Sequence, residues 1–386
     1  MNKFMRTTLV ACIFLFFTGD AFSFDSGLIE KIRKRKNDFH GRDLNSADLR
    51  NADLKGVNFE NTDLRRAKLN GASLVDARMN GAKLNSAEME KADLSGAHLN
   101  RADLRRASMP GSRFVKSVLR QAKFYGSDLK GAVFNSADMF RADLMRAEME
   151  GASFRKARMH NADLSGAYLS SADFRGADLR GVNFFGADLR SIKLSGARLQ
   201  DARFFFADMR NVDLSGEKID SMGLNGANLS GCDLSGAVFS GSTFISTDLT
   251  FASLRGATLK DSVLTRADLT GADLRKADMS GSKLVEACLN SARCAESVMS
   301  GTIMKKASLV STDFSRARLD RADFRDADCD KTDFSGTDLR GADFTGSNLS
   351  RARFAGARLD AAVINRKYRG MLINQGVNIR KVIWTD

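Results

Sequence analysis

The sequence predicts an all-β solenoid, in which the chain winds into short stacked coils. Two observations predict this fold class. A large apolar residue recurs at every fifth position from Phe39 to Ile364, without insertion or deletion. A small residue stands two positions before most of these, as Ala47 does before Leu49. A fixed short repeat is typical of solenoids, and a period of five fits neither a helix nor simple alternation along a flat strand.

The small and the large residue of each repeat are expected to face the interior together. Residues two apart in extended backbone point the same way, so the other three positions of the repeat face solvent. The position between them is often Asp or Asn, as in Ala102-Asp103-Leu104. We interpret this residue as structural, because Asp and Asn side chains accept hydrogen bonds from nearby backbone N–H groups at turns.

A period of ten overlies the period of five. Most phenylalanines at the large position fall in alternate repeats, and only Phe39, Phe59 and Phe239 fall in the other set. This favours a coil with an even number of sides, with Phe on one pair of opposite walls and Leu or Met on the other. The larger set comprises Phe114, Phe124, Phe134, Phe154, Phe174, Phe184, Phe204, Phe244, Phe314, Phe324, Phe334, Phe344 and Phe354.

The repeated motif Ala-(Asp/Asn)-Leu-x-x resembles the pentapeptide-repeat family. The resemblance implies a right-handed quadrilateral parallel β-helix over residues 39–364, with four repeats in each coil and coils about 4.8 Å apart. The family includes acidic, cytoplasmic DNA mimics that bind gyrase. This chain carries a formal charge of +13, so we do not transfer that function to it.

Residues 1–23 have the pattern of a secretory signal peptide. Lys3 and Arg6 precede an apolar core over residues 9–17, and Ala21-Phe22-Ser23 forms a small-x-small cleavage site. The apolar core is too short to span a membrane. We therefore expect an exported protein that is periplasmic or secreted.

Two segments are expected to cap the solenoid, because an open end exposes the core and unpaired strand edges. Residues 24–38 are expected to form a short N-terminal helix, whose basic side is either a solvated face or an anchor to an anionic surface. Residues 365–386 are rich in apolar side chains and are expected to form a C-terminal cap. This tail is also a candidate homodimer contact, as in some relatives.

Two positions depart from the repeat. Pro110 follows a large residue, so we expect it at a corner where no backbone N–H is needed. Glu217 occupies a small inward position, where an unpaired buried carboxylate would be costly. We expect a local bulge that turns Glu217 to solvent, with a kink or a weak coil near residues 215–224.

The sequence contains no signature of an enzyme. His98 and His160 are expected several coils apart, too far to share a metal. We find no phosphate-binding glycine loop, nucleophile elbow or Cys/His metal spacing, and therefore expect no catalytic residue, metal or cofactor. The cysteines beyond the signal are expected to be free thiols, with Cys294 and Cys329 at large inward positions, Cys232 at a small inward one and Cys288 outward.

One series of outward residues is unusually apolar. At the position after the large residue, one wall is expected to carry Tyr125, Met145, Phe185, Phe205, Ile245 and Val285, and Phe206 widens this strip. Contiguous exposed apolar surface usually marks an interaction site, although such side chains can also lie flat and merely shield the wall. We expect a rod-shaped scaffold that binds a protein partner through this strip. The alternatives are salt-dependent binding of polyanions or anionic envelope surfaces, and a secreted effector.

Overall fold

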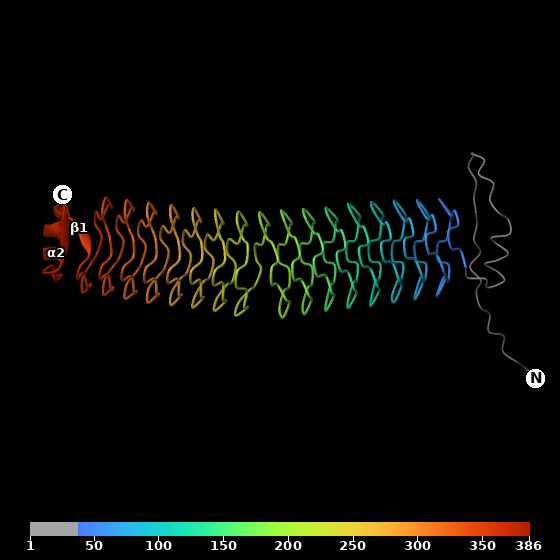
Figure 1. The fold of residues 1–386 in the computed structure, drawn as a ribbon, viewed down its shortest axis with the longest axis horizontal. Coiled ribbons are helices and arrows are strands. Elements are labelled where there is room, and N and C mark those ends of the chain that lie inside the picture. Colours follow the sequence, from blue (N-terminus) through green and yellow to red (C-terminus); the bar gives the residue numbers. More distant parts are fainter. Residues whose placement is uncertain (1–37) are drawn as a thin grey trace, which may run out of the picture. The chain divides into compact units, whose positions relative to one another are not determined.

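A computed structural model describes residues 38–386 of the chain. The expected signal peptide at 1–23 and nearly all of the expected helical cap at 24–38 lie outside the described residues. The described chain divides into two compact units, each made of stacked coils (Figure 1). Unit 1 comprises the described residues up to Tyr168 together with Ala172–Asp178, and unit 2 comprises Leu169–Ser171 and Leu179–Asp386.

Both units consist of coils that pair in parallel with a shift of 20 residues. Asp43 pairs with Asp63 in unit 1, and Asp233 pairs with Ser253 in unit 2. The hydrogen bonds are equally regular: the N–H of Leu44 donates to the carbonyl of Asp63 at 2.7 Å. Twenty residues are four repeats, so each coil has four sides. The predicted right-handed quadrilateral β-helix is confirmed.

Every corner of a coil is a tight turn. The N–H of Ala47 donates to the carbonyl of Leu44 at 3.0 Å, and Ser46, the third residue of that turn, has a φ of 59°. A positive φ at the third residue is characteristic of type II turns. The Asp before the large residue supports the corner, because Asp43 Oδ1 accepts a hydrogen bond from the N–H of Asn45 at 3.0 Å. The structural interpretation of the Asp/Asn position is thus confirmed.

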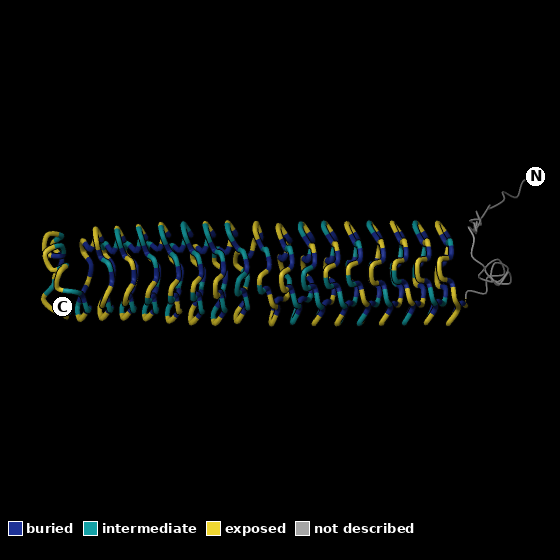
Figure 2. The backbone as a smooth tube through the Cα atoms, turned by 90° about the horizontal axis from the view of Figure 1, so that it is seen from above, coloured by how far each residue is buried: buried dark blue, intermediate teal, exposed yellow. Residues whose placement is uncertain are grey.

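The interior is filled by the small and large residues of each repeat, which appear in Figure 2 as buried positions recurring in every coil. Phe114 and Phe134 stack in parallel with ring centroids 4.7 Å apart. Phe124 meets Phe114 edge to face at 6.0 Å from the opposite wall. The same two kinds of contact recur in unit 2 between Phe324 and Phe344 and between Phe334 and Phe344. The predicted pair of phenylalanine walls is confirmed.

Pro110 lies at a corner, as predicted. In the described coils, the N–H of the residue after each large residue donates to no backbone carbonyl of another coil. Proline therefore removes nothing from the ladder there, and its carbonyl still accepts from the N–H of Lys91 at 3.0 Å.

The ladder of unit 2 is interrupted between residues 192–201 and residues 213–220, where the regular inter-coil hydrogen bonds are missing. Glu217 lies half-buried at this interruption, and its Oε1 accepts from the N–H of Gly196 at 3.3 Å. Its backbone keeps the register, because the N–H of Val238 donates to the Glu217 carbonyl at 2.9 Å. The predicted weak coil is confirmed, whereas the expected bulge is wrong. The chain keeps its register without an extra residue, and the Glu217 carboxylate accepts the Gly196 N–H in place of a backbone carbonyl of the next coil.

The chain ends in four short elements at the end of unit 2 (Figure 1): β1 Val363–Asn365, the 3₁₀ helix η1 Arg366–Tyr368, α2 Arg369–Asn374 and β2 Ile383–Thr385. Strands β1 and β2 pair in parallel, with Val363 opposite Ile383. This pairing continues the shift of 20 residues, so β2 adds one more strand to the stack.

The helical part of this segment covers the last coil. The N–H of Leu349 donates to Tyr368 Oη at 3.0 Å, and the N–H of Phe354 donates to Gln375 Oε1 at 2.6 Å. Leu372 of α2 is fully buried. Side-chain oxygens thus stand where a further coil would supply carbonyls. In the described residues, no helix is long and apolar enough to cross a membrane.

Candidate functional site

The predicted apolar strip divides between the two units and differs in exposure along its length. In unit 2, Phe185 and Ile245 are 49% and 38% exposed, and Phe206 is 63% exposed. Phe205 lies half-buried between them. We refer to these four residues of unit 2 as the apolar patch.

Aromatic contacts hold the apolar patch together. The rings of Phe185 and Phe206 meet edge to face, with centroids 5.4 Å apart. The rings of Phe205 and Phe206 each lie over a glycine of the next coil: a Cβ on Gly223 would be 2.7 Å from Phe205, and one on Gly226 would be 2.5 Å from Phe206. The glycines therefore provide the space in which the two rings lie.

The apolar patch is also poor in charge. In the corner segments 183–186, 203–206, 223–226 and 243–246, the only charged residue is Arg203, although 28% of the whole chain is charged. Depletion of charged residues together with aromatic enrichment characterises the centres of protein–protein interfaces.

The remaining predicted strip residues are less exposed. Tyr125 and Met145 of unit 1 and Val285 of unit 2 are half-buried. The hydroxyl of Tyr125 accepts a hydrogen bond from Arg146 at 3.5 Å. The half-buried state of these three side chains agrees with the alternative interpretation, in which they lie flat and shield their own wall.

Sequence reasoning did not single out Phe251, which is 73% exposed. It occupies the positive-φ position of a corner, with a φ of 57°, and its ring lies over Gly271. The available signal was an aromatic residue at a position that, apart from Phe206, small, polar or charged residues hold in the described coils. Phe251 lines an open groove of unit 2, to which Arg190 and Arg210 contribute from earlier coils.

Much of the positive charge is neutralised locally, where Arg follows Asp by two residues. Arg190 donates to both carboxylate oxygens of Asp188, at 2.8 and 2.6 Å. The Arg190 guanidinium holds the pKa of Asp188 below its usual value. The same arrangement occurs at Arg50–Asp48, Arg65–Asp63, Arg105–Asp103, Arg175–Asp173, Arg210–Asp208, Arg275–Asp273, Arg325–Asp323 and Arg340–Asp338.

Other basic side chains are not neutralised in this way. Arg66, Lys83, Arg106, Lys123 and Arg146 follow one wall of unit 1 and form no ion pair within 4.0 Å in the described part of the chain. They form a cationic row that formal charge alone does not reveal.

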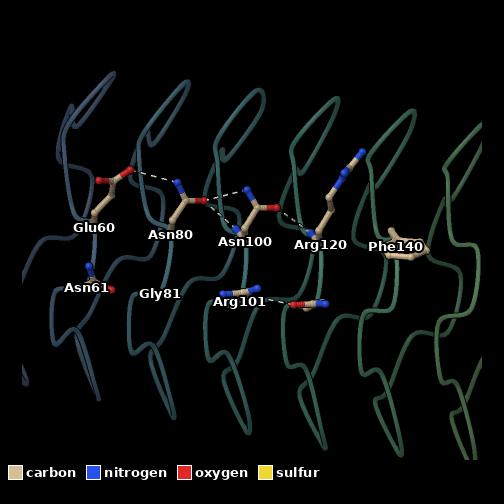
Figure 3. A pocket seen from close by; sticks show the side chains of 9 residues that line it. Glu60, Asn61, Asn80, Gly81, Asn100, Arg101, Arg120 and Phe140 are labelled. Carbon is tan, nitrogen blue, oxygen red and sulfur yellow. Dashed lines mark hydrogen bonds between the residues drawn. The ribbon is translucent and has the colours of Figure 1, made fainter.

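A polar groove of about 550 Å³ runs along a different corner of unit 1 (Figure 3). Its floor is a chain of hydrogen bonds from coil to coil. Asn80 donates to Glu60 at 3.1 Å, and the side-chain amide of Asn100 donates to Asn80 at 3.0 Å. The N–H of Arg120 donates to Asn100 at 3.2 Å, and Phe140 closes one end.

Glu60 is neutralised at the other end of this groove. Hydrogen bonds from Asn80 and then Arg78 hold its pKa below the usual value, so it is ionised at neutral pH. The guanidinium of Arg78 lies 3.1 Å from the Glu60 carboxylate. The groove therefore has no uncompensated negative charge at Glu60.

The cysteines lie where the repeat places them. Cys232, Cys294 and Cys329 are buried and Cys288 is half-buried, and all four are free. Burial raises the pKa of the Cys232 thiol to about 11. Among the residues that the structure describes, no group of three or more His, Cys, Asp or Glu side chains could hold a metal ion.

The sequence matches the family model described as pentapeptide repeats. The matches cover residues 38–71, 62–101, 97–135, 142–181, 183–216, 224–261, 252–290, 287–326 and 327–366. Among curated proteins, no significant match to the chain was found.

Solved structures of pentapeptide repeat proteins are similar to this chain at low identity. QnrB1, a plasmid-mediated fluoroquinolone resistance protein, is 20% identical with a TM-score of 0.39, covering 46% of this chain and 90% of its own. HetL, involved in heterocyst differentiation regulation in the cyanobacterium Nostoc, is 23% identical with a TM-score of 0.19, covering 86% of this chain and 95% of its own. A pentapeptide repeat protein of the Arabidopsis thaliana thylakoid lumen is 24% identical with a TM-score of 0.25, and the match covers 25% of this chain and 68% of that protein. At these values the likeness supports no functional inference.

Proposed function

Because the chain belongs to the pentapeptide-repeat family, we propose that it is a non-catalytic scaffold that binds a protein partner through the apolar patch of unit 2. The observation that carries this proposal is the exposure of Phe185, Phe206 and Ile245 on a face that is nearly free of charge. Exposed aromatic residues surrounded by uncharged surface are typical anchors of protein interfaces.

The backbone at Phe206 decides which substitution tests this role. Phe206 has a φ of 58°, a conformation that costs a non-glycine residue roughly 1–2 kcal/mol. Its neighbours at the same corner of adjacent coils, Gly186 and Gly226, avoid that cost. The same conformation occurs at the third residue of corners throughout the described coils, as at Ser46 and Ser246, so the exposure of the ring and not its backbone carries the proposal.

The test is capture from cell-envelope and medium fractions with two matched variants of the full chain. Phe206→Gly removes the ring and relieves the strain, whereas Ser246→Gly relieves the same strain at the same corner position without removing a ring. We expect a partner that the unaltered chain and Ser246→Gly retain and Phe206→Gly loses. Equal recovery by both variants would remove the apolar patch from the proposal.

We further propose that the chain is exported through residues 1–23, on the evidence of their sequence pattern. Mass spectrometry of the protein purified from its native cells is expected to find Phe24 as the first residue. An intact Met1 in a cytosolic fraction would contradict export.

Self-association through residues 365–386 is a separate proposal. Ile373 of α2 and Ile383 of β2 are each 52% exposed in this short segment. Analytical ultracentrifugation is expected to give a dimer that Ile373→Ser with Ile383→Ser converts to a monomer. A monomer before substitution would exclude this contact.

Binding of a polyanion is the second candidate function, and the unpaired cationic row of unit 1 favours it. Lysine and arginine that form no ion pair within the protein keep N–H donors for phosphate or carboxylate groups. Such binding should weaken steeply between low and high salt, whereas binding through the apolar patch should change little.

A further inference from the structure

The polar groove of unit 1 is a candidate ligand site that is independent of the apolar patch. Each coil contributes one residue to its floor, so the floor residues repeat at the coil spacing of about 4.8 Å. Glu60, Asn80, Asn100 and Arg120 follow one another in this way (Figure 3). A second row beside them contains Arg101 and Gln121, which are joined by a 3.0 Å hydrogen bond.

The floor presents hydrogen-bonding groups that the internal contacts do not use up. The side-chain amides of Asn80 and Asn100 each donate one hydrogen bond within the floor, and an amide NH₂ group has two N–H donors. The Oε1 of Gln121 accepts from Arg101, which leaves the Gln121 NH₂ group available. The groove therefore offers a regular series of planar donors suited to a ligand rich in hydroxyl or carboxylate oxygens.

The charges of the groove favour an acidic ligand. Arg101 and Arg120 line it, whereas its one carboxylate, Glu60, is compensated by Arg78. Arg120 uses its Nε to contact Asp138 at 2.7 Å, and a guanidinium has five N–H donors. Several of these donors remain for a carboxylate, which arginine binds in bidentate fashion.

An aromatic ring closes the groove. Phe140 lines its end and is backed by His160, with parallel rings 6.0 Å apart. The Arg141 guanidinium lies 5.1 Å from the centre of the same ring. A fixed ring of this kind suits the apolar C–H face of a pyranose.

We propose that this groove binds a linear acidic polysaccharide, with uronate carboxylates at Arg101 and Arg120 and ring hydroxyls along the asparagine floor. The coil spacing is close to the rise of one hexose in an extended chain, so successive sugars meet successive coils. A nucleic acid strand is less suited, because its phosphates are more widely spaced and its bases would need an aromatic ring at several coils. The groove has one such ring, Phe140.

The test uses the full chain and purified oligogalacturonates of increasing length as the probe. Arg101→Gln with Arg120→Gln removes the two cations of the groove. Arg321→Gln with Arg340→Gln is the matched control, because these residues occupy the same two rows in unit 2. Arg340, like Arg120, pairs with one aspartate, although its partner Asp338 lies in its own coil and Asp138 lies in the coil after Arg120. Circular dichroism verifies that both variants are folded.

We expect calorimetric affinity to rise with oligomer length over several sugars, to fall at least tenfold in the groove variant and to remain unchanged in the control. Absence of binding to every oligomer, or equal weakening in both variants, would overturn the proposal. Oligothymidylate that binds as tightly, with the same loss in the groove variant, would also overturn it and assign the groove to nucleic acid.

Discussion

Replacing Glu217 by Ala should make the protein more stable, although the substitution removes a hydrogen bond. The small inward position normally holds Ala, as at Ala237 and Ala277, which are fully buried. Glu217 is too large for that position, and its carboxylate instead reaches Gly196. We infer that this side chain holds the two coils of unit 2 apart, and that Ala allows them to pair.

The magnitude follows from the regular ladder. By comparison with other coils, six donations to backbone carbonyls are missing between residues 192–201 and 213–220, from the N–H groups of Leu194, Gly196, Leu199, Asp201, Asp213 and Lys218. At about 0.5 kcal/mol for each solvent-accessible bond, these amount to about 3 kcal/mol. Loss of the bond to Glu217 subtracts about 1 kcal/mol, so the expected gain in the free energy of unfolding is about 2 kcal/mol.

Hydrogen exchange measures the ladder directly. In the unaltered protein, peptides over 193–201 and 213–220 should exchange faster than the equivalent peptides over 253–261 and 273–280. In Glu217→Ala the difference should disappear, and the Tm should rise by a few degrees. Ala277→Glu, at the same side of a coil three turns later, should create a new fast-exchanging site. Unchanged exchange with a lower Tm in Glu217→Ala would refute the reasoning.

Three further predictions concern the cap, the thiols and the Asp–Arg pairs. Tyr368→Phe and Gln375→Ala each leave an N–H of the last coil without its acceptor and should cost about 1 kcal/mol of unfolding free energy in urea titrations, with faster exchange confined to residues 349–386. Only Cys288 should react with a thiol reagent in the native protein, because the other described thiols are buried. Mass spectrometry of labelled peptides tests this prediction, and rapid labelling of a buried thiol would contradict it. The Arg190 guanidinium lowers the pKa of Asp188 in the folded protein, so the ion pair stabilises the fold above the unfolded pKa of about 3.9, and this stabilisation is lost as pH falls through the lower folded pKa. The Tm should therefore be constant from pH 8 to 5 and fall below about pH 4. A decline that begins near pH 6 would argue against control by these carboxylates.

The fold could be predicted from the sequence because the interior repeats without interruption. Each large residue meets its equivalent in the next coil, so local spacing determines long-range contacts. For the same reason Pro110 and Glu217 stood out as departures. The response at Glu217 was only partly predictable, because whether a carboxylate is expelled or finds a backbone partner depends on the neighbouring coil at Gly196.

The candidate sites were less predictable because they lie on the outward positions, where packing does not decide conformation. The strip pattern found Phe185 and Phe206, but it treated Tyr125 and Met145 as equivalent, and their burial depends on how each side chain lies on its neighbours. The groove in unit 1 escaped notice because polar residues are expected on a surface. Its identity as a groove depends on hydrogen bonds such as that from Asn100 to Asn80.

The side-chain acceptors at the C-terminal end also decide how the stacking stops. The two edges of a coil are complementary, because the N–H of Leu44 donates to the carbonyl of Asp63 and the N–H of Asp63 donates to the carbonyl of Arg42. Nothing in the repeat itself therefore prevents another chain from adding to the last coil. Tyr368 and Gln375 occupy two walls of that edge with groups that accept hydrogen bonds but offer no strand there, whereas β2 adds a strand on another wall only. The cap is therefore a chain terminator: without it, the last coil would be a template for end-to-end growth of the kind that drives fibre formation.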